Sequence, residues 1–412
     1  MNAATSPLRV LILTETYRPE IGGGERQAAV LGAGLKRRGH EVMLLTRHSR
    51  PGLADEESID GMPVVRVGPS GPGRRRKWGL LFTVLPALLR LRRRYDVVLV
   101  SGFRILAVPA LLARRLTGAP VVLKADSVGE FSGEFFRAGL AGTGLTLSSS
   151  LVRAALWLRN RLLQRAAAYV AISDEIADEL SAHGVALQKV YRIPNGVDTH
   201  LFRPVTLHER TSLRTRLGLP SGPVVVYTGR LVSYKGLPLL VEAWRKLAPE
   251  FPGAVLVLVG EGGGDMHDCE PMLREFVAQH GLEPQVRFTG PVSNVQDWLQ
   301  AADAFVFPTE NEAFGLSLVE AMACGLPAVT TQVGGLRDFV DHRVNAWAIE
   351  PGEATGLIAG LRALLADSAL AARLGATARE TVLARFGEEA VTQAYEQLLD
   401  AVLRGSRQEV AA

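Results

Sequence analysis

Two cations and two carboxylates stand in the chain at spacings that suit the binding of a diphosphate. Arg230 and Lys235 follow the apolar run 224–228, and Glu312 and Glu320 follow the apolar run 304–307. A guanidinium offers a rigid fork of donors and an ammonium a compact charge, so this pair can neutralise a diphosphate without a metal ion. One carboxylate is then free to accept hydrogen bonds from sugar hydroxyls, and the other from ribose hydroxyls.

The segment between the two carboxylates predicts a helix N-terminus. Residues 313–316 form a turn before the helical stretch that carries Glu320, and the first amides of a helix have no partner inside it, which favours a bound anion. The apolar neighbours of Glu320 argue against a purely solvated carboxylate. The alternative is that Arg230 and Lys235 are ordinary surface cations, Glu312 a helix cap and Glu320 a surface residue.

The elements that must position these residues recur as strand, then helix, in two cycles. Continuous apolar runs, rather than alternating ones, indicate parallel sheets covered on both faces. The first cycle has strands near 9–14, 40–46, 64–67, 97–100, 121–123 and 169–172, and the second near 224–228, 254–259, 286–289, 304–307 and 328–330. We expect two doubly wound α/β units joined near Val205 to Leu217, with the ligand at the carboxyl ends of the strands, in a cleft between the units.

Composition narrows the class of protein. The chain has 412 residues, of which 47% are hydrophobic and 21% charged, as in a globular protein of two domains. Two distant cysteines, Cys269 and Cys324, exclude a thiolate zinc site and argue against a disulfide scaffold. We therefore expect a cytoplasmic protein, without a signal peptide or a membrane-spanning helix. Residues 1–200 carry 28 Lys and Arg against 17 Asp and Glu, which suggests that this half meets something anionic.

Together these motifs resemble the donor site of the retaining glycosyltransferases of family 4, which have the GT-B fold. The resemblance also covers the segments 22–25, 171–173, 194–198 and 334–335. It implies two Rossmann-like domains that face an interdomain cleft. Residues 1–200 would bind the acceptor and 201–385 the nucleotide sugar, and the helix in 386–412 would return to the first domain.

The resemblance also assigns roles to single residues. Arg230, Lys235 and Glu312 would be catalytic, with the two cations on the diphosphate and the carboxylate on the donor sugar. The implied reaction moves a hexose-type sugar from a UDP- or GDP-sugar with retention, without a metal, a cofactor or a protein nucleophile. The residues implied in donor binding are Gly23, Gly24, Gly229, Phe314, Gly315, Leu316 and Glu320.

The chain departs from the family pattern after the fifth strand. Where many members have a histidine, this chain has Asp126, with Lys124 and Glu130 nearby. An ionised carboxylate only accepts hydrogen bonds, whereas imidazole can also donate one. We place these three residues and Asn195 at the acceptor side of the predicted cleft. A second departure is Ala313, where a glycine is usual before Phe314.

A basic stretch, Arg74–Arg94, allows two interpretations. It carries Trp78 among apolar residues and arginines at both ends, a pattern typical of a segment lying on an anionic membrane, which would suit a lipid-linked acceptor. The alternative is a helix packed on the sheet with its arginines in water. A polysaccharide, a cell-envelope component or a small glycoside is an equally open acceptor. No nucleic-acid motif is present.

Three rival functions remain to be weighed. An NAD-linked dehydrogenase needs GxGxxG directly after a strand, and neither 22–25 nor 260–265 meets that pattern. A GT-B protein with other chemistry, such as a nucleotide-sugar epimerase, stays open because fold alone does not decide function. A non-catalytic binding protein is disfavoured because all four charged residues are present together.

Overall fold

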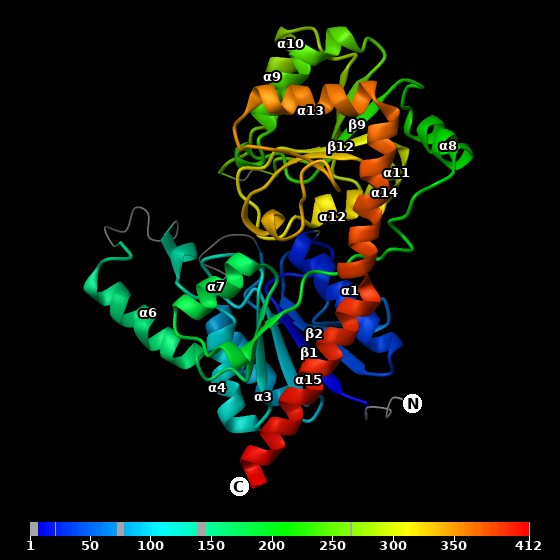
Figure 1. The fold of residues 1–412 in the computed structure, drawn as a ribbon. Helices are drawn as coiled ribbons and strands as arrows, with labels where there is room; N and C mark the ends of the chain where they lie inside the picture. The colour runs from blue at the N-terminus through cyan, green and yellow to red at the C-terminus, as the bar shows by residue number, and fades with distance from the viewer. Residues whose placement is uncertain (1–6, 21, 72–77, 138–145, 264–265, 412) are drawn as a thin grey trace. The chain divides into compact units, whose positions relative to one another are not determined.

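The chain folds into two compact units. The structure is a computed structural model, and it describes residues 7–20, 22–71, 78–137, 146–263 and 266–411. Unit 1 comprises Met1–Gly196 and Glu388–Ala412, and unit 2 comprises Val197–Gly387. Both units are Rossmann-like, and the C-terminal helix belongs to unit 1 (Figure 1). The two Rossmann-like α/β units and the return of the C-terminal helix to the first unit confirm the expected fold class.

Unit 1 is built on an eight-stranded sheet in the order β3-β4-β2-β1-β5-β6-β7-β8. The neighbours β1 and β5 mark the place where the strand order reverses, which is where doubly wound sheets bind ligands. The strands are β1 (Arg9–Thr14), β2 (Glu41–Arg47), β3 (Glu56–Ile59), β4 (Met62–Val67), β5 (Val97–Ser101), β6 (Val121–Ala125), β7 (Ala168–Ala171) and β8 (Val190–Arg192).

One strand of unit 1 runs against the expected parallel direction. Strand β3, which the sequence analysis missed, pairs antiparallel with β4, and Ile59 faces Met62 across a two-residue turn. Both turn residues, Asp60 and Gly61, have positive φ angles of 52° and 72°. Asp-Gly is a favoured sequence for such a turn. The unit 1 sheet is therefore parallel, as expected, except for this edge strand.

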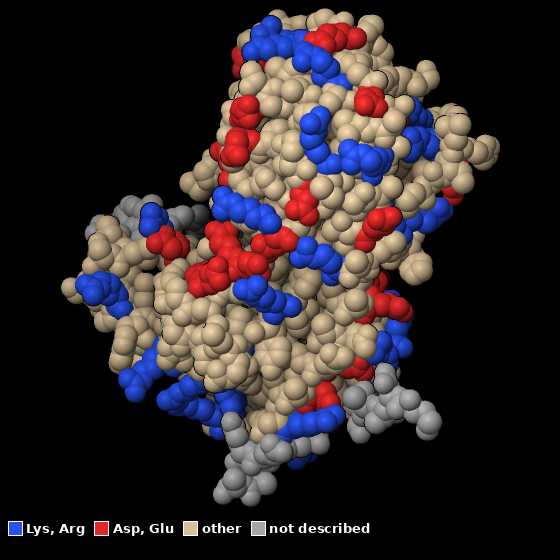
Figure 2. All heavy atoms as spheres, viewed as in Figure 1, with Lys and Arg blue, Asp and Glu red and all other residues tan. Residues whose placement is uncertain are grey.

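Helices cover both faces of the unit 1 sheet (Figure 1). Helix α1 packs against the C-terminal helix α15, and α4 packs against both α3 and α6. Figure 2 shows blue Lys and Arg side chains spaced between tan ones along α6. The helices are α1 (Gly23–Arg37), α3 (Leu80–Leu91), α4 (Ala107–Thr117), α6 (Ser150–Leu163), α7 (Asp174–Ala182) and α15 (Glu388–Ala411), with 3-10 turns η1 (Glu134–Phe136) and η2 (Leu187–Lys189).

Helix α15 is part of the unit 1 core. Its Tyr395 and Leu399 are buried against a cluster that includes Leu35 of α1. Its Glu396 accepts hydrogen bonds from Arg38 Nε at 2.7 Å and His40 Nε2 at 3.0 Å. The amide of Leu8 donates to His40 Nδ1, so the imidazole is left with its proton on Nε2, toward the carboxylate.

Unit 2 is built on a six-stranded parallel sheet in the order β11-β10-β9-β12-β13-β14. Its strands are β9 (Val224–Thr228), β10 (Val255–Val259), β11 (Val286–Gly290), β12 (Ala304–Phe307), β13 (Ala328–Thr331) and β14 (Trp347–Ile349). Its helices are α8 (Leu207–Leu217), α9 (Leu237–Leu247), α10 (Glu270–Gln279), α11 (Val295–Ala301), α12 (Leu316–Ala323), α13 (Ala354–Ala366) and α14 (Ser368–Arg385), with 3-10 turns η3 (Ser233–Lys235), η4 (Ala248–Glu250) and η5 (Gly334–Asp338).

The expected junction at 205–217 is wrong, because most of that segment is helix α8 of unit 2. Thr206 accepts a hydrogen bond from the Glu209 amide, and the Glu209 side chain accepts one from Thr206, which together form a capping box. Gly218 ends the helix with a left-handed conformation. The units instead divide at Gly196 and Val197.

Helix α3 lies in the basic stretch that allowed two interpretations. It buries Leu80, Val84 and Leu88, as the alternative of a helix packed on the sheet predicts, while Arg92, Arg93 and Arg94 are exposed. Arg74 to Lys77 lie outside the described residues. Within the described part of the chain, no helix is both long enough and apolar enough to cross a membrane.

Candidate active site

The loop after β9 brings Lys235 to the carboxyl end of β12. Gly236 has a φ of 71°, and a Cβ placed there would lie 2.0 Å from the carbonyl oxygen of Pro308. Only glycine permits this approach. At the start of the loop, the Gly229 amide donates to the Val259 carbonyl at 3.0 Å. The Gly-Arg-x4-Lys-Gly spacing is therefore fixed by two close backbone contacts.

Lys235 and Glu312 form the central pair of this site. Lys235 Nζ lies 2.6 Å from Glu312 Oε2 and 3.4 Å from the carbonyl oxygen of Asn311. The two side chains are 14% and 17% exposed, so the pair is mostly shielded from water. The sequence predicts both residues but not their contact, because 77 positions separate them in the chain.

Arg230 is exposed and held by a residue that the sequence analysis missed. Its Nη2 donates to the hydroxyl of Tyr234 at 2.5 Å, and its guanidinium lies over the same ring, 5.9 Å from the centroid. The ammonium of Lys235 lies 5.5 Å from that centroid. Tyr234 thus touches both predicted cations. Its position between them in the Gly-Arg-x4-Lys-Gly motif is the sequence feature that could have predicted this role.

Helix α12 begins beside Glu312, as the sequence predicts. Gly315 caps it with a φ of 94°, and a Cβ there would lie 2.2 Å from Leu336. The amides of Gly315 and Leu316 open the helix, where backbone donors lack intrahelical partners. The Phe314 amide is engaged, because it donates to Glu312 Oε1 at 3.4 Å, and the Phe314 ring is buried.

Glu320 lies on α12 with only 3% of its surface exposed. This burial agrees with its apolar neighbours in the sequence and excludes a solvated surface role. A buried carboxylate is stable only with polar partners. Its contact with a ribose stays a prediction.

In unit 1, two glycines of helix α1 face open space. A Cβ at Gly23 would meet nothing within 4 Å, and one at Gly24 would meet only Asp126 Oδ2, at 3.7 Å. Neither has a positive φ. The protein's own packing therefore does not require glycine at these positions, which leaves room for a ligand to approach the start of α1.

Asp126 is held at the carboxyl end of β6 by two neighbours. Lys124 Nζ is paired with Asp126 Oδ1, and the Ser101 hydroxyl donates to Oδ2 at 2.8 Å. Gly102, with a φ of 65°, makes room for this carboxylate, since a Cβ there would lie 3.2 Å from Oδ2. The place expected for a histidine is thus filled by an ion-paired carboxylate.

Glu130 lies in the loop that follows and is fully buried. Its Oε1 accepts from Arg104 Nε at 3.3 Å and from the Ser127 hydroxyl at 3.2 Å, whereas its Oε2 has no hydrogen-bond partner in the part of the chain described. Burial raises the pKa of Glu130 to about 7, against the opposing effect of Arg104. Asp126 and Lys124 are near enough to contribute to this pKa as well.

Asn195, the fourth residue predicted at the acceptor side, has a different setting. It is 9% exposed and precedes Gly196, whose amide and carbonyl both pair with Gln27 of α1. None of the contacts described for Lys124, Asp126 and Glu130 includes it. The structure thus groups three of the four residues.

Two family models match most of the chain. One, for glycosyl transferases group 1, covers residues 209–381, and the other, for glycosyltransferase family 4, covers residues 21–201. A D-inositol 3-phosphate glycosyltransferase of Catenulispora acidiphila is 33% identical, over 80% of this chain and 79% of its own length. The chain belongs to glycosyltransferase family 4. Glycogen synthase of Mycobacterium tuberculosis, a more distant relative, is 27% identical over 97% of this chain and 96% of its own.

Solved structures agree on the fold. The Anabaena protein HepE, in complex with UDP and glucose, superposes with a TM-score of 0.76 at 22% identity, over 95% of this chain and 99% of its own. A sucrose-phosphate synthase from Thermosynechococcus elongatus superposes with a TM-score of 0.77 at 24% identity, over 95% and 100%. The GT-B fold of this family 4 chain is therefore established.

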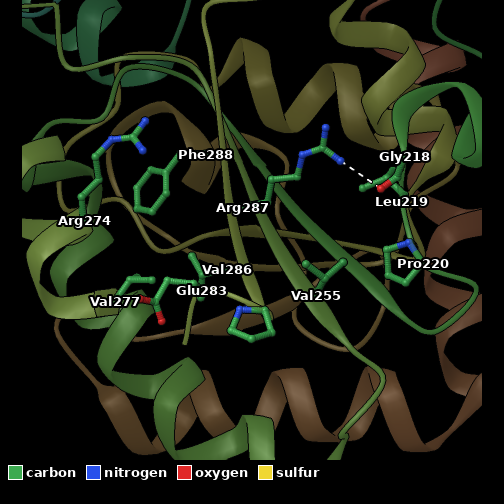
Figure 3. Close-up of a pocket in the computed structure, with 11 residues that line it drawn as sticks. Gly218, Leu219, Pro220, Val255, Arg274, Val277, Glu283, Val286, Arg287 and Phe288 are labelled. Atoms are coloured by element: carbon green, nitrogen blue, oxygen red, sulfur yellow. Dashed lines mark hydrogen bonds between the residues drawn. The ribbon is translucent and has the colours of Figure 1, made fainter. Parts of the chain in front are cut away.

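A separate cavity of about 590 Å³ lies near the amino ends of β10 and β11 in this family 4 chain (Figure 3). Arg274 lies over the ring of Phe288, 4.4 Å from its centroid, and pairs with Glu270. Arg287 donates to the carbonyl oxygens of Leu217 and Gly218. Both arginines are already engaged by other groups of the protein, so we assign the cavity no role. Among the described residues, no three His, Cys, Asp or Glu side chains group as metal ligands would.

Proposed function

We propose that this glycosyltransferase moves a hexose-type sugar from a UDP- or GDP-sugar to an acceptor with retention of anomeric configuration. The observation that carries the proposal is the Lys235–Glu312 pair beside Arg230 and the start of α12. It combines cations and backbone donors for a diphosphate with a carboxylate for sugar hydroxyls.

In this proposal, Arg230 and Lys235 stabilise the negative charge that develops on the departing nucleoside diphosphate. Their charges replace a metal ion, and no cofactor is needed beyond the donor itself. The acceptor hydroxyl attacks from the face that the diphosphate leaves, and the leaving phosphate oxygen takes its proton. Stabilisation of developing charge by fixed donors is a large term in catalysis, and this route needs no protein nucleophile.

The relatives give more support for the identity of the donor than for the identity of the acceptor. HepE has been solved with UDP-glucose as well as with UDP, which favours a uridine nucleotide here. The names of relatives point to different acceptors, since one is a D-inositol 3-phosphate glycosyltransferase and another a glycosyltransferase of lipopolysaccharide core biosynthesis. We propose an acceptor that is lipid-linked or belongs to the cell envelope, with a polysaccharide or a small glycoside as alternatives. A lipid-linked acceptor implies work at the inner face of a membrane, through the basic stretch that ends at Arg94.

Thermal unfolding with a ligand panel tests the proposal. UDP, GDP, ADP, their common sugar conjugates and NAD are each added with and without EDTA. A ligand that binds only the folded state raises the melting temperature, by several degrees at about 100 times its Kd. We expect a shift with UDP or GDP that EDTA does not change. A shift with NAD alone, or one abolished by EDTA, contradicts the proposal.

Product analysis tests the chemistry. With the donor identified, the anomeric configuration of the product by NMR should match that of the donor sugar. An inverted product would rule out the retaining reaction. Conversion of the donor sugar to an epimer without acceptor would instead support the epimerase-like alternative.

A further inference from the structure

Helix α6 carries an apolar stripe that no described part of the protein covers. Of its 14 residues only Leu163 is buried. Leu151, Trp157 and Leu158 are 72%, 63% and 65% exposed. Leu151, Ala154, Ala155 and Leu158 recur at the spacing of one helix face, and all four are exposed. We call these four residues the α6 stripe.

Cations flank the α6 stripe. Arg153, Trp157 and Arg161 follow one another at intervals of four residues and so line its edge. The Arg161 guanidinium lies 5.4 Å from the centroid of the Trp157 ring. An aromatic ring and guanidinium groups beside an apolar stripe form the pattern of a helix that lies in a membrane interface.

The opposite side of α6 fixes the helix to unit 1. Arg159 donates to the carbonyl oxygens of Arg104, Glu130 and Phe131, at distances of 2.7 to 3.1 Å. Leu156 packs beside Gly133, where a Cβ would lie 2.6 Å from Leu156 Cδ2. The helix is therefore held by its inner face, and the described residues leave its outward stripe exposed.

The charge around the stripe points to an anionic partner. Residues 80–94, 107–117 and 150–165 hold ten arginines and no Asp or Glu. They belong to α3, α4 and α6, of which α4 packs on the other two. Arg90 pairs with Glu56 of β3, and Glu134 of the nearby turn η1 pairs with Arg137. The exposed arginines in these segments are Arg90, Arg92, Arg93, Arg94, Arg115, Arg153, Arg161 and Arg165.

We propose that α6 docks unit 1 on an anionic lipid bilayer, with the α6 stripe and Trp157 in the interface and the arginines against lipid phosphates. Apolar exposure alone would suit many partners, but it coincides here with three neighbouring helices that carry arginines and no acidic residue, with Glu56 and Glu134 as acidic neighbours. Both features are what a negatively charged bilayer attracts. Helices α4 and α6, with the α6 stripe, lie outside the 74–94 stretch, whereas α3 and the arginines that follow it lie within that stretch. The docking itself does not depend on the proposed transfer reaction.

Docking through α6 would place the acceptor side of unit 1 close to lipid. Arg159 joins α6 to the loop that holds Glu130, directly after the β6 end that carries Asp126. An acceptor anchored in the bilayer would then meet this loop without leaving the membrane, a step that rests on the proposed function.

Vesicle flotation of the full chain tests the docking. Vesicles of phosphatidylcholine with phosphatidylglycerol are compared with phosphatidylcholine alone, at 0.1 M and 0.5 M salt. We expect binding to the anionic vesicles at the lower salt, a marked loss at the higher salt because charges are screened, and little binding to phosphatidylcholine. The combined variant Leu151→Ser, Trp157→Ser and Leu158→Ser should lose about tenfold or more of the bound fraction, and Arg153→Gln with Arg161→Gln should lose severalfold.

Matched controls separate this surface from general hydrophobicity. Leu187→Ser and Leu207→Ser change leucines that are 74% and 79% exposed elsewhere, and both should bind as the parent does. The shift of melting temperature with UDP or GDP should be equal in all variants, which checks folding and reports on the proposed function separately. Equal flotation of the parent and the combined variant would overturn the proposal, as would no flotation of the parent with anionic vesicles.

Discussion

The side chains of Lys235 and Glu312 hold each other in place, and under the proposed function each would also contact the donor. At 2.6 Å the pair is a charge-assisted hydrogen bond. Such a bond orients both groups before a ligand arrives. Loss of either partner therefore removes a direct contact and leaves the other group misdirected.

We predict that Lys235→Ala and Glu312→Ala each lower kcat/KM by a factor of about 100 to 1000, the loss typical of removing one donor to developing charge, about 3–4 kcal/mol. The double variant should be little worse than either single one, because coupled residues are not additive. Steady-state kinetics measure this, and the melting temperature should change little.

Lys246→Ala is the matched control for the lysine. Lys246 pairs with Glu242 on the outside of α9, at 3.4 Å and half-exposed, and surface pairs of this kind contribute little. It should keep parental turnover. Near-parental turnover in Lys235→Ala or Glu312→Ala would show that the assigned roles are wrong.

Gly24, at the start of α1, should matter for transfer and not for stability. Outside its own helix and chain neighbours, a Cβ at Gly24 would have only Asp126 Oδ2 within 4 Å, at 3.7 Å. Gly24→Ala should therefore leave stability equal or higher, because alanine adopts the helical conformation more readily than glycine. It should nevertheless reduce kcat/KM, since the methyl occupies space proposed for the donor or acceptor. Gly405→Ala, in α15 and also without neighbours, should leave transfer unchanged. If Gly24→Ala kept the parental kcat/KM, neither the donor nor the acceptor would bind beside this residue.

The sequence predicted which residues gather at the β9 and β12 ends, but not how they pair. Chain order and apolar runs locate a strand end and the residue after it, which suffices for Arg230, Lys235 and Glu312. Contacts such as Arg230 to Tyr234, or Arg159 to three carbonyls, depend on side-chain reach and leave no periodic trace. Long apolar strands were predicted, whereas the three-residue strands β8 and β14 are too short to stand out.

At the scale of elements, helices α6 and α7 clamp the loop after β6. Arg159 of α6 donates to two of its carbonyls, and the carboxylate of Glu179 on α7 accepts from the amides of Gly129 and Ser132 at 2.7 and 2.9 Å. The clamp keeps Glu130 away from water. The raised pKa of Glu130 therefore depends on the two helices that hold the loop in place.

This burial predicts a pH dependence of stability. The pKa of Glu130 is about 7 in the folded state, against an ordinary value of 4.5. Between these values the folded state holds a proton that the unfolded state has lost, so the free energy of unfolding falls as pH rises, by up to about 3 kcal/mol. The contribution is complete below pH 4.5 and is lost as pH passes through 7.

Urea unfolding at several pH values from 4.5 to 8 checks this. Glu130→Gln keeps the shape of the side chain but does not titrate, so its stability should fall less over this range than that of the parent. Glu134→Gln, a more exposed change in η1, should retain the parental slope. Identical slopes in the parent and Glu130→Gln would mean that Glu130 keeps an ordinary pKa.

At the scale of the whole molecule, the two units differ in how the chain builds them. Unit 2 is one continuous segment, 197–387, whereas unit 1 needs α15 from the far end of the chain. Apart from Gly23 and Gly24, every residue predicted to bind the nucleotide-sugar donor lies in unit 2. Gly23, Gly24, Asp126 and Glu130 lie in unit 1. A fragment that contains only unit 2 should therefore still bind the donor but should not transfer the sugar.

We predict that the isolated segment 197–387 folds and binds UDP or GDP with a Kd within about tenfold of that of the full chain, a difference of about 1.4 kcal/mol, yet transfers no sugar. Its sheet and helices pack within the segment, so folding does not require unit 1. Calorimetric titration measures the Kd, and Lys235→Ala in the same segment should weaken it. A folded segment without nucleotide binding would mean that the start of α1 supplies much of the diphosphate site. Binding with transfer intact would mean that the acceptor is held by unit 2 alone.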